Sequence, residues 1–140
     1  MKVCTDACIQ GAFTARHLAE NDTTVPAILD IGTGTGLLSL MLAQCVDATI
    51  TAVELDPAAA RQAAQNLEPS PWANRLMLTQ QDIRKMEGEG SYDFIITNPP
   101  FFEGSLKSGH AQKDQAMHAT DLSYRELIAA IDRQLSPCGE

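Results

Sequence analysis

An amide, two prolines and an aromatic residue directly follow an apolar run, and they are Asn98, Pro99, Pro100 and Phe101. The side-chain oxygen of Asn98 accepts hydrogen bonds, and a proline offers a carbonyl but no N–H. Two acceptors that converge on one point suit a planar –NH2 group, and the prolines restrict the backbone that carries them. Phe101 adds a ring that can stack on a flat substrate. We interpret these residues as a candidate catalytic site; the alternative is a proline turn with a packed aromatic ring.

The glycine-rich stretch "DIGTGTG" stands between an apolar run and a helix-like run, and it is a candidate cofactor site. Glycines permit a tight turn and close approach of the backbone to a ligand. The spacing GxGxG differs from the dinucleotide fingerprint GxGxxG, whose last position is here Leu37, and no GK[ST] follows. The alternative is a turn kept for packing alone. The residues expected to contact a cofactor here are Asp30, Gly32, Thr33, Gly34 and Gly36.

Two further acids stand where apolar runs end. Glu54 can accept hydrogen bonds from both hydroxyls of a ribose, or it is simply a solvated acid. Asp82 can accept from an adenine amino group, with the backbone of Ile83 at the ring edge, or it caps a short helix over residues 82–86. These features fit an adenosine-containing cofactor. A carboxylate at Asp30 suits a cationic sulfonium with a methionine tail better than it suits a pyrophosphate.

Helix-like and strand-like segments alternate along the chain, which predicts an α/β domain with a mostly parallel sheet. Strands are expected at 25–31, 49–54, 76–79 and 92–97. A first helix should run to about Leu18, capped by Thr5 or Asp6. Asp56 and Pro57 should begin another helix, and a well-buried one should follow the glycines.

The last helix has the strongest start signal. Ser123 and Glu126 form a capping box, with Leu122 and Leu127 placed for a hydrophobic staple. The spacing predicts a buried face made of Leu127, Ile128, Ile131 and Leu135.

These segments predict a Rossmann-like, doubly wound sheet of strand order 3-2-1-4. In such a sheet ligands bind where the order reverses, here between strands one and four. The loops "GTGTG" and "NPPFF" should therefore lie side by side. The fourth strand would be an edge with unpaired backbone groups. We therefore expect residues 1–140 to be a single domain that is truncated at its C-terminal strands and belongs to a longer protein.

Bulk properties exclude several classes of protein. The chain has 140 residues, 44% of them hydrophobic, and a net charge of −8, so it can bury one core but is a poor candidate for a broad nucleic-acid footprint. No apolar run is long enough to cross a bilayer, and the N-terminus lacks a secretory h-region. The four cysteines include no CxxC pair, so we expect reduced cysteines, no metal and a cytoplasmic protein.

Taken together, "DIGTGTG", "VELD" and "NPPF" resemble the motifs of class I S-adenosylmethionine-dependent methyltransferases of the N-methylating kind. The resemblance implies S-adenosyl-L-methionine as cofactor and in-line transfer of its methyl group to an amine held by Asn98 and Pro99. It also implies that Thr5 and Asp6 contact the methionine end of the cofactor.

A narrower resemblance, to the tRNA1(Val) adenine N6-methyltransferases, is carried by "MKVCTDACIQGAF", "ELDPAAARQAAQNLEPSPWANRL" and "NPPFF". This subfamily usually has glycine in place of Cys4 and often tyrosine in place of Phe101. The resemblance implies a tRNA partner. Alternatives are methylation of a glutamine amide in a protein or of guanine N2 in ribosomal RNA. A non-catalytic cofactor-binding module and an NAD-dependent dehydrogenase are the rivals from other classes.

Overall fold

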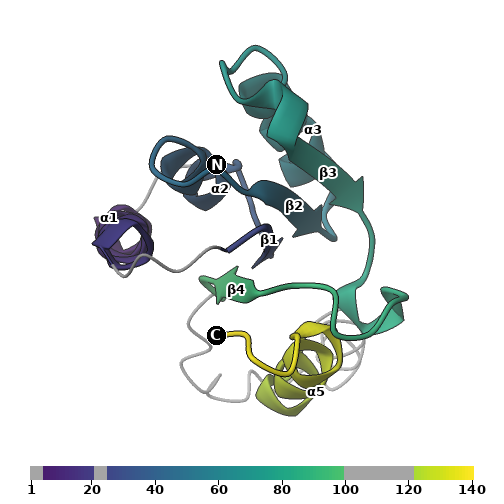
Figure 1. Ribbon diagram of the computed structural model, residues 1–140. Coiled ribbons are helices and arrows are strands. Elements are labelled where there is room, and N and C mark those ends of the chain that lie inside the picture. Colours follow the sequence, from purple (N-terminus) through teal and green to yellow (C-terminus); the bar gives the residue numbers. More distant parts are fainter. Residues whose placement is uncertain (1–4, 21–24, 100–121) are drawn as a thin grey trace.

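A computed structural model describes residues 5–20, 25–99 and 122–140, so Pro100 and Phe101 lie outside the described residues. The helices and strands are, in chain order, α1 (Thr5–Glu20), β1 (Ala27–Ile31), α2 (Leu37–Ala43), β2 (Thr49–Glu54), α3 (Pro57–Leu67), η1 (Ala73–Arg75), β3 (Leu76–Gln80), η2 (Ile83–Lys85), β4 (Phe94–Thr97) and α5 (Tyr124–Gln134) (Figure 1). None of the helices in these ranges combines the length and apolar character that a bilayer span requires.

The strands form one parallel sheet in the order β3-β2-β1-β4, as the sequence predicted. β1 is central: Ile28 pairs with Ile50 on one side and with Phe94 on the other. The order reverses between β1 and β4, so their carboxyl ends open onto the same crevice.

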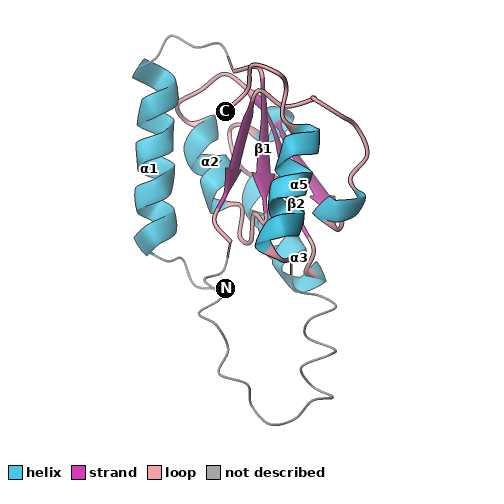
Figure 2. Ribbon diagram, turned by 90° about the horizontal axis from the view of Figure 1, so that it is seen from below, coloured by secondary structure: helices cyan, strands magenta, loops and turns pink. Residues whose placement is uncertain are grey.

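Two apolar layers sandwich the sheet, because successive residues of a strand face opposite sides. On one face Ile28 and Ile50 pack with Leu18 of α1 and Leu42 of α2. On the other face Leu29, Ile31 and Val53 pack with Leu127 and Ala130 of α5. Figure 2 shows α1 and α2 on one side of the strands and α5 on the other.

Helix α1 approaches α2 closely because Gly11 has no side chain. A Cβ at Gly11 would lie 2.5 Å from the sulfur of Met41 and 3.2 Å from Leu38. The predicted caps of α1 are wrong: Thr5 and Asp6 are both inside its first turn. The acid at Asp6 still favours this end, since it lies at the positive end of the helix dipole.

The starts of α3 and α5 confirm the sequence prediction. The side chain of Asp56 accepts from the backbone N–H of Ala59 at 2.8 Å, and Pro57 follows at the first helical position. In α5, Ser123 and Glu126 form both bonds of the capping box. The predicted buried face of α5 is partly wrong: Ile128 is 64% exposed, and the buried residues are Leu127, Ala130 and Gln134.

Gln134 is fully buried because its amide has backbone partners. Its Nε2 donates to the carbonyls of Gly88 at 3.0 Å and Met86 at 3.2 Å. The loop between η2 and β4 is thereby held against α5. A polar residue at a core position of the helix was not predicted from the apolar spacing.

β4 lies at the end of the sheet, as expected, but its outer backbone groups are not all unpaired. The N–H of Glu140 donates to Asp93, and the N–H of Ile95 donates to Glu140 at 2.8 Å. Tyr92 also forms a parallel bridge with Leu135. The segment after α5 therefore covers part of this edge, which corrects the expectation of a bare strand.

Candidate active site at the ends of β1 and β4

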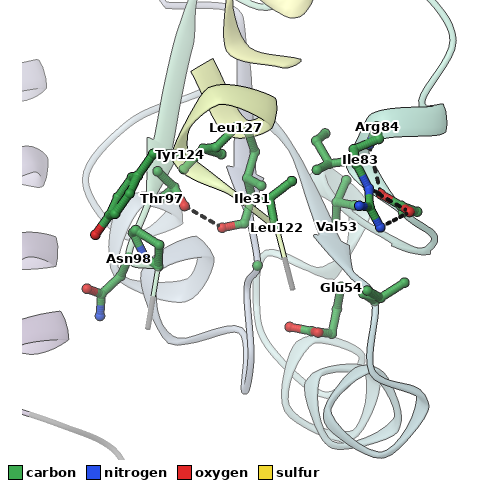
Figure 3. Close-up of a pocket in the computed structure, with 14 residues that line it drawn as sticks. Ile31, Val53, Glu54, Ile83, Arg84, Thr97, Asn98, Leu122, Tyr124 and Leu127 are labelled. Carbon is green, nitrogen blue, oxygen red and sulfur yellow. Dashed lines mark hydrogen bonds and ion pairs between the residues drawn. The ribbon is translucent and has the colours of Figure 1, made fainter. Parts of the chain in front are cut away.

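The ends of β1 and β4, from which the two predicted loops leave, are neighbours, as the predicted strand order requires. Ile31 and Thr97 are register partners at the ends of these strands. The hydroxyl of Thr97 donates to the carbonyl of Ile31 at 2.9 Å, and Asn98 follows immediately (Figure 3). The backbone of Asn98 therefore stands beside the start of the glycine turn, and Asn98 and Gly32 line one cavity.

The glycine turn depends on left-handed backbone at Gly32, Gly34 and Gly36, whose φ angles are 70°, 59° and 81°. The N–H groups of Gly32 and Thr33 both donate to the carbonyl of Val53, which ties the turn to β2. A Cβ at Gly32 would meet nothing within 4 Å, whereas one at Gly36 would lie 3.0 Å from Leu67. Gly36 thus permits packing against α3, and Gly32 leaves open space beside the pocket.

Asp30 stabilises the glycine turn through its buried carboxylate. Its carboxylate is fully buried and accepts from the hydroxyls of Thr33 at 2.6 Å and Ser39 at 2.7 Å through one oxygen. The other oxygen has no partner among the described residues. Burial raises the pKa of Asp30 above its ordinary value, and the two hydroxyl bonds oppose that shift. Asp30 is not on the pocket wall, so its contact with a cofactor stays a prediction.

Glu54 reaches from the end of β2 to the turn. One carboxylate oxygen accepts from the N–H of Gly34 at 2.9 Å, and the other accepts from the N–H of Asp56 at 2.9 Å. Each oxygen keeps a further lone pair, so the side chain can still accept from a ligand. Glu54 lines the pocket on the side opposite Asn98 (Figure 3).

The carboxylate of Asp82 is bound by Arg84, two residues further along the chain. Its carboxylate caps η2 by accepting from the backbone N–H of Arg84 at 3.0 Å, and it pairs with the guanidinium of Arg84 at 2.7 Å. This guanidinium lowers the pKa of Asp82. Arg84 also contacts Glu126 of α5 at 3.1 Å. The capping alternative for Asp82 is therefore seen, and its contact with an adenine amino group stays a prediction.

One cavity of about 220 Å³ connects these elements. Six of its lining residues were predicted from the sequence, namely Gly32, Glu54, Asp82, Ile83, Asn98 and Pro99. The remaining ones are mainly apolar and come from strand ends, from η2 and from the start of α5: Ile31, Val53, Leu55, Arg84, Thr97, Leu122, Tyr124 and Leu127. The α5 group was missed because no motif marks it; its only signal is the capping box just beyond Leu122.

Thr33, Gly34 and Gly36 belong to the turn but not to the cavity wall. Thr5 and Asp6 are exposed in the first turn of α1. Another residue of α1 does reach the site: Nε2 of Gln10 donates to the carbonyl of Thr97 at 2.9 Å. Gln10 was not identified from the sequence, and it connects α1 to the residue that precedes Asn98.

The cavity fits an adenosine-containing cofactor in three respects. The open space at Gly32 lets a ligand pass close to the backbone. Apolar residues such as Val53 and Ile83 provide surfaces for a ring. Glu54 supplies acceptors for hydroxyl groups. Within the described ranges, no group of three or more acidic, histidine or cysteine side chains is arranged to hold a metal ion.

A doubly wound sheet with an open glycine turn after β1 and an acid at the end of β2 defines a Rossmann-like nucleotide-binding domain. The chain belongs to the methyltransferase small domain family, whose model matches residues 10–132. It is 48% identical to the tRNA1(Val) (adenine(37)-N6)-methyltransferase of Dyadobacter fermentans, over 100% of this chain and 56% of that protein. The enzymes of the same name from Cytophaga hutchinsonii and Bacteroides fragilis are 47% and 44% identical, over 58% and 57% of their lengths. This chain therefore spans little more than half of the relatives it matches.

Solved structures agree on the fold. The geranyl diphosphate C-methyltransferase of Streptomyces coelicolor superposes with a TM-score of 0.70 at 14% identity, covering 94% of this chain and 43% of that one. A glycopeptide N-methyltransferase complexed with S-adenosylmethionine gives a TM-score of 0.65 at 20% identity, covering 92% of this chain and 51% of that one. At these identities the similarity shows the fold alone.

Proposed function

We propose that this chain carries the active site of an S-adenosylmethionine-dependent N-methyltransferase that modifies a planar exocyclic amine. Adenine N6 in a tRNA is the substrate that we favour, in a protein of the cytoplasm. The observation that carries the proposal is the juxtaposition of Gly32 with Asn98 and Pro99 in one cavity. A methyl donor at the turn would stand next to the acceptor atoms that can hold an amine.

The cofactor would lie along the ends of β1 and β2. Glu54 would accept from the ribose hydroxyls, and Ile83 would lie against the adenine, near Asp82. The turn at Gly32 would let the methionine portion pass toward β4. When bound, the cofactor supplies a methyl group on a positively charged sulfur, which an amine nitrogen can attack in line.

Asn98 and Pro99 would orient the amine. The side-chain oxygen of Asn98 and the carbonyl of Pro99 accept its two hydrogens and thereby turn the nitrogen lone pair out of conjugation with the ring. Asn98 and Pro99 would thereby keep the amine nitrogen in line with the methyl group that a bound sulfonium cofactor would supply, with the thioether as leaving group. The nitrogen then loses a proton to water, so no strong base is needed before attack. Pro100 and Phe101 would stiffen and flank this acceptor site.

The preference for tRNA rests on the names and the 44–48% identity of the relatives. A protein glutamine amide and guanine N2 of ribosomal RNA also present a planar amine and remain the alternatives. Any base inside a helix would have to leave its stack to reach Asn98. A module that only binds the cofactor would not need Asn98.

The test is transfer of labelled methyl from S-adenosylmethionine to tRNA by the wild-type chain and by Asn98→Ala. We expect the variant to lose activity on the order of 100-fold, the usual cost of misplacing a reacting group. Its affinity for S-adenosylhomocysteine should be unchanged. The matched control is Asn74→Ala, an exposed amide in η1, which should keep full activity.

Equal transfer by Asn98→Ala and the wild type would contradict the catalytic role. Calorimetric titration with S-adenosylhomocysteine and with NAD tests the dehydrogenase alternative. Tight binding of NAD with no binding of S-adenosylhomocysteine would show that the cofactor is NAD.

A further inference from the structure

The first turn of α5 and the residue before its N-cap form part of the wall of the same cavity as Asn98 and Pro99, through Tyr124, Leu127 and Leu122. The turn has a fixed conformation. Oγ of Ser123 accepts from the N–H of Glu126 at 3.3 Å, and the carboxylate of Glu126 accepts from the N–H of Ser123 at 2.9 Å. The backbone from which Tyr124 extends is therefore held in one conformation.

Tyr124 differs from Leu122 and Leu127 in its exposure. Leu127 is 6% exposed and belongs to the core beneath the sheet, and Leu122 packs against it. Tyr124 is 57% exposed, although its ring borders the cavity. Its hydroxyl forms no hydrogen bond with another described residue. The core therefore does not account for the position of this aromatic ring.

Figure 3 shows where the ring points. The ring of Tyr124 stands beside Thr97 and Asn98, and its hydroxyl extends in the same direction as the amide of Asn98. Glu54 lies at the opposite side of the cavity. The ring is thus at the acceptor end of the site, away from the end assigned to the ribose.

We propose that Tyr124 is an aromatic wall of the acceptor pocket, against which the flat group carrying the target –NH2 packs face to face. The inference rests on the proposed function, because it needs a planar acceptor at Asn98. Stacking on an aromatic face suits any base, and the capping box already fixes the backbone that carries the ring. Tyr124 would bind the acceptor through its ring, and the hydroxyl would be dispensable.

The test compares Tyr124→Ala and Tyr124→Phe in methyl transfer to the anticodon stem–loop of tRNA1(Val). For Tyr124→Ala we expect kcat/KM to fall roughly 5- to 150-fold, which corresponds to the ~1–3 kcal/mol of one base–aromatic stack. Most of the change should be in KM. Tyr124→Phe should stay within about 3-fold of the wild type. Both variants should bind S-adenosylhomocysteine as the wild type does.

Ile128→Ala is the matched control, because Ile128 is similarly exposed on α5, one turn further along, and does not line the cavity. It should retain wild-type kcat/KM. If Tyr124→Ala kept wild-type kcat/KM, the role of Tyr124 would be overturned and the proposed function would stand. The same holds if kcat/KM fell as far in Tyr124→Phe as in Tyr124→Ala. If neither the wild-type chain nor Asn98→Ala transferred a methyl group to RNA, the proposed function would be overturned, and this inference with it.

Discussion

At the scale of single residues, several of the polar groups picked out by motif bond to the protein itself. Asp30 accepts two hydroxyls beneath the glycine turn, and Asp82 pairs with Arg84. Glu54 also bonds the backbone, but it does so while lining the cavity. A sequence motif identifies such acids without showing which of them faces the ligand, because that depends on neighbours such as Ser39 and Arg84.

Replacing Glu54 by alanine should weaken the binding of S-adenosylhomocysteine by about 1–3 kcal/mol, the cost of leaving the ribose hydroxyls unpaired. Calorimetry measures the change directly. Glu87→Ala is the control, since Glu87 is an exposed acid away from the cavity. An affinity that Glu54→Ala leaves unchanged would remove this carboxylate from the cofactor site.

At the scale of elements, the site is assembled by contacts that link helices to strand ends. Arg84 joins η2 to α5 through Glu126 at 3.1 Å, and Gln10 joins α1 to β4 at 2.9 Å. On the far side of the sheet, Arg75 donates to the carbonyls of Ala43, Val46 and Ala48 and holds the end of α2. These links connect residues distant in sequence, so no local pattern predicts them.

The capping box of α5 should make the protein sensitive to acid. Hydrogen bonds from Ser123, then those from Arg84, lower the pKa of Glu126 from 4.5 to about 2. A lowered folded-state pKa means that the stability from Glu126 is present above pH 4.5 and is lost as the pH falls toward 2. In acid unfolding followed by circular dichroism, Glu126→Gln should therefore lose less stability than the wild type over this window.

Glu89→Gln is the control for the acid experiment, because Glu89 is exposed outside any helix, and this variant should follow the wild-type curve. Asp30, whose pKa is raised, has the opposite pH dependence, but it is the same in all three proteins and cancels in the comparison. Identical pH curves for Glu126→Gln and the wild type would show that the charge of Glu126 does not stabilise the fold.

Replacing Gln10 by alanine should destabilise the protein by about 1 kcal/mol, the net value of one hydrogen bond, because the carbonyl of Thr97 loses its donor. It should also lower kcat more than affinity for S-adenosylhomocysteine, since Thr97 precedes Asn98. Urea unfolding and methyl-transfer kinetics measure the two effects. Gln44→Ala removes a comparable amide bond, to Leu40 at 3.2 Å on an exposed helix end, and should change neither. If Gln10→Ala and Gln44→Ala had the same stability and the same kcat, the bond from Gln10 to Thr97 would have no role in positioning the site.

At the scale of the whole molecule, the fold was predictable because alternating periodicity and right-handed crossovers leave few sheet orders. The neighbouring positions of Gly32 and Asn98, at the starts of the two loops, follow from the order 3-2-1-4. The contribution of α5 to the cavity was not predictable, because it depends on how the helix packs onto the second face of the sheet. Exposed Ile128 and buried Gln134 show the same limit: apolar spacing gave the helix but not its exact rotation.

The charge of the molecule bears on how it would bind RNA. The net charge is −8, and the guanidinium groups of Arg75, Arg84 and Arg133 all bond protein oxygens. We expect few phosphate contacts, so the slope of log K for tRNA against log salt should be shallow, about −1 to −3. Fluorescence anisotropy over a salt series measures it, with S-adenosylhomocysteine affinity as the control. A slope steeper than about −5 would contradict this expectation.

The central claim is that the methyl donor and the amine acceptor share one cavity, with the transferred methyl between Gly32 and Asn98. A crystal structure of the chain with S-adenosylhomocysteine tests this most directly. We predict the ribose at Glu54 and the sulfur beyond Gly32, facing the oxygens of Asn98 and Pro99 across the space of one methyl group and one amine. A ligand bound elsewhere, or one whose sulfur points toward Arg84 and away from Asn98, would contradict the account.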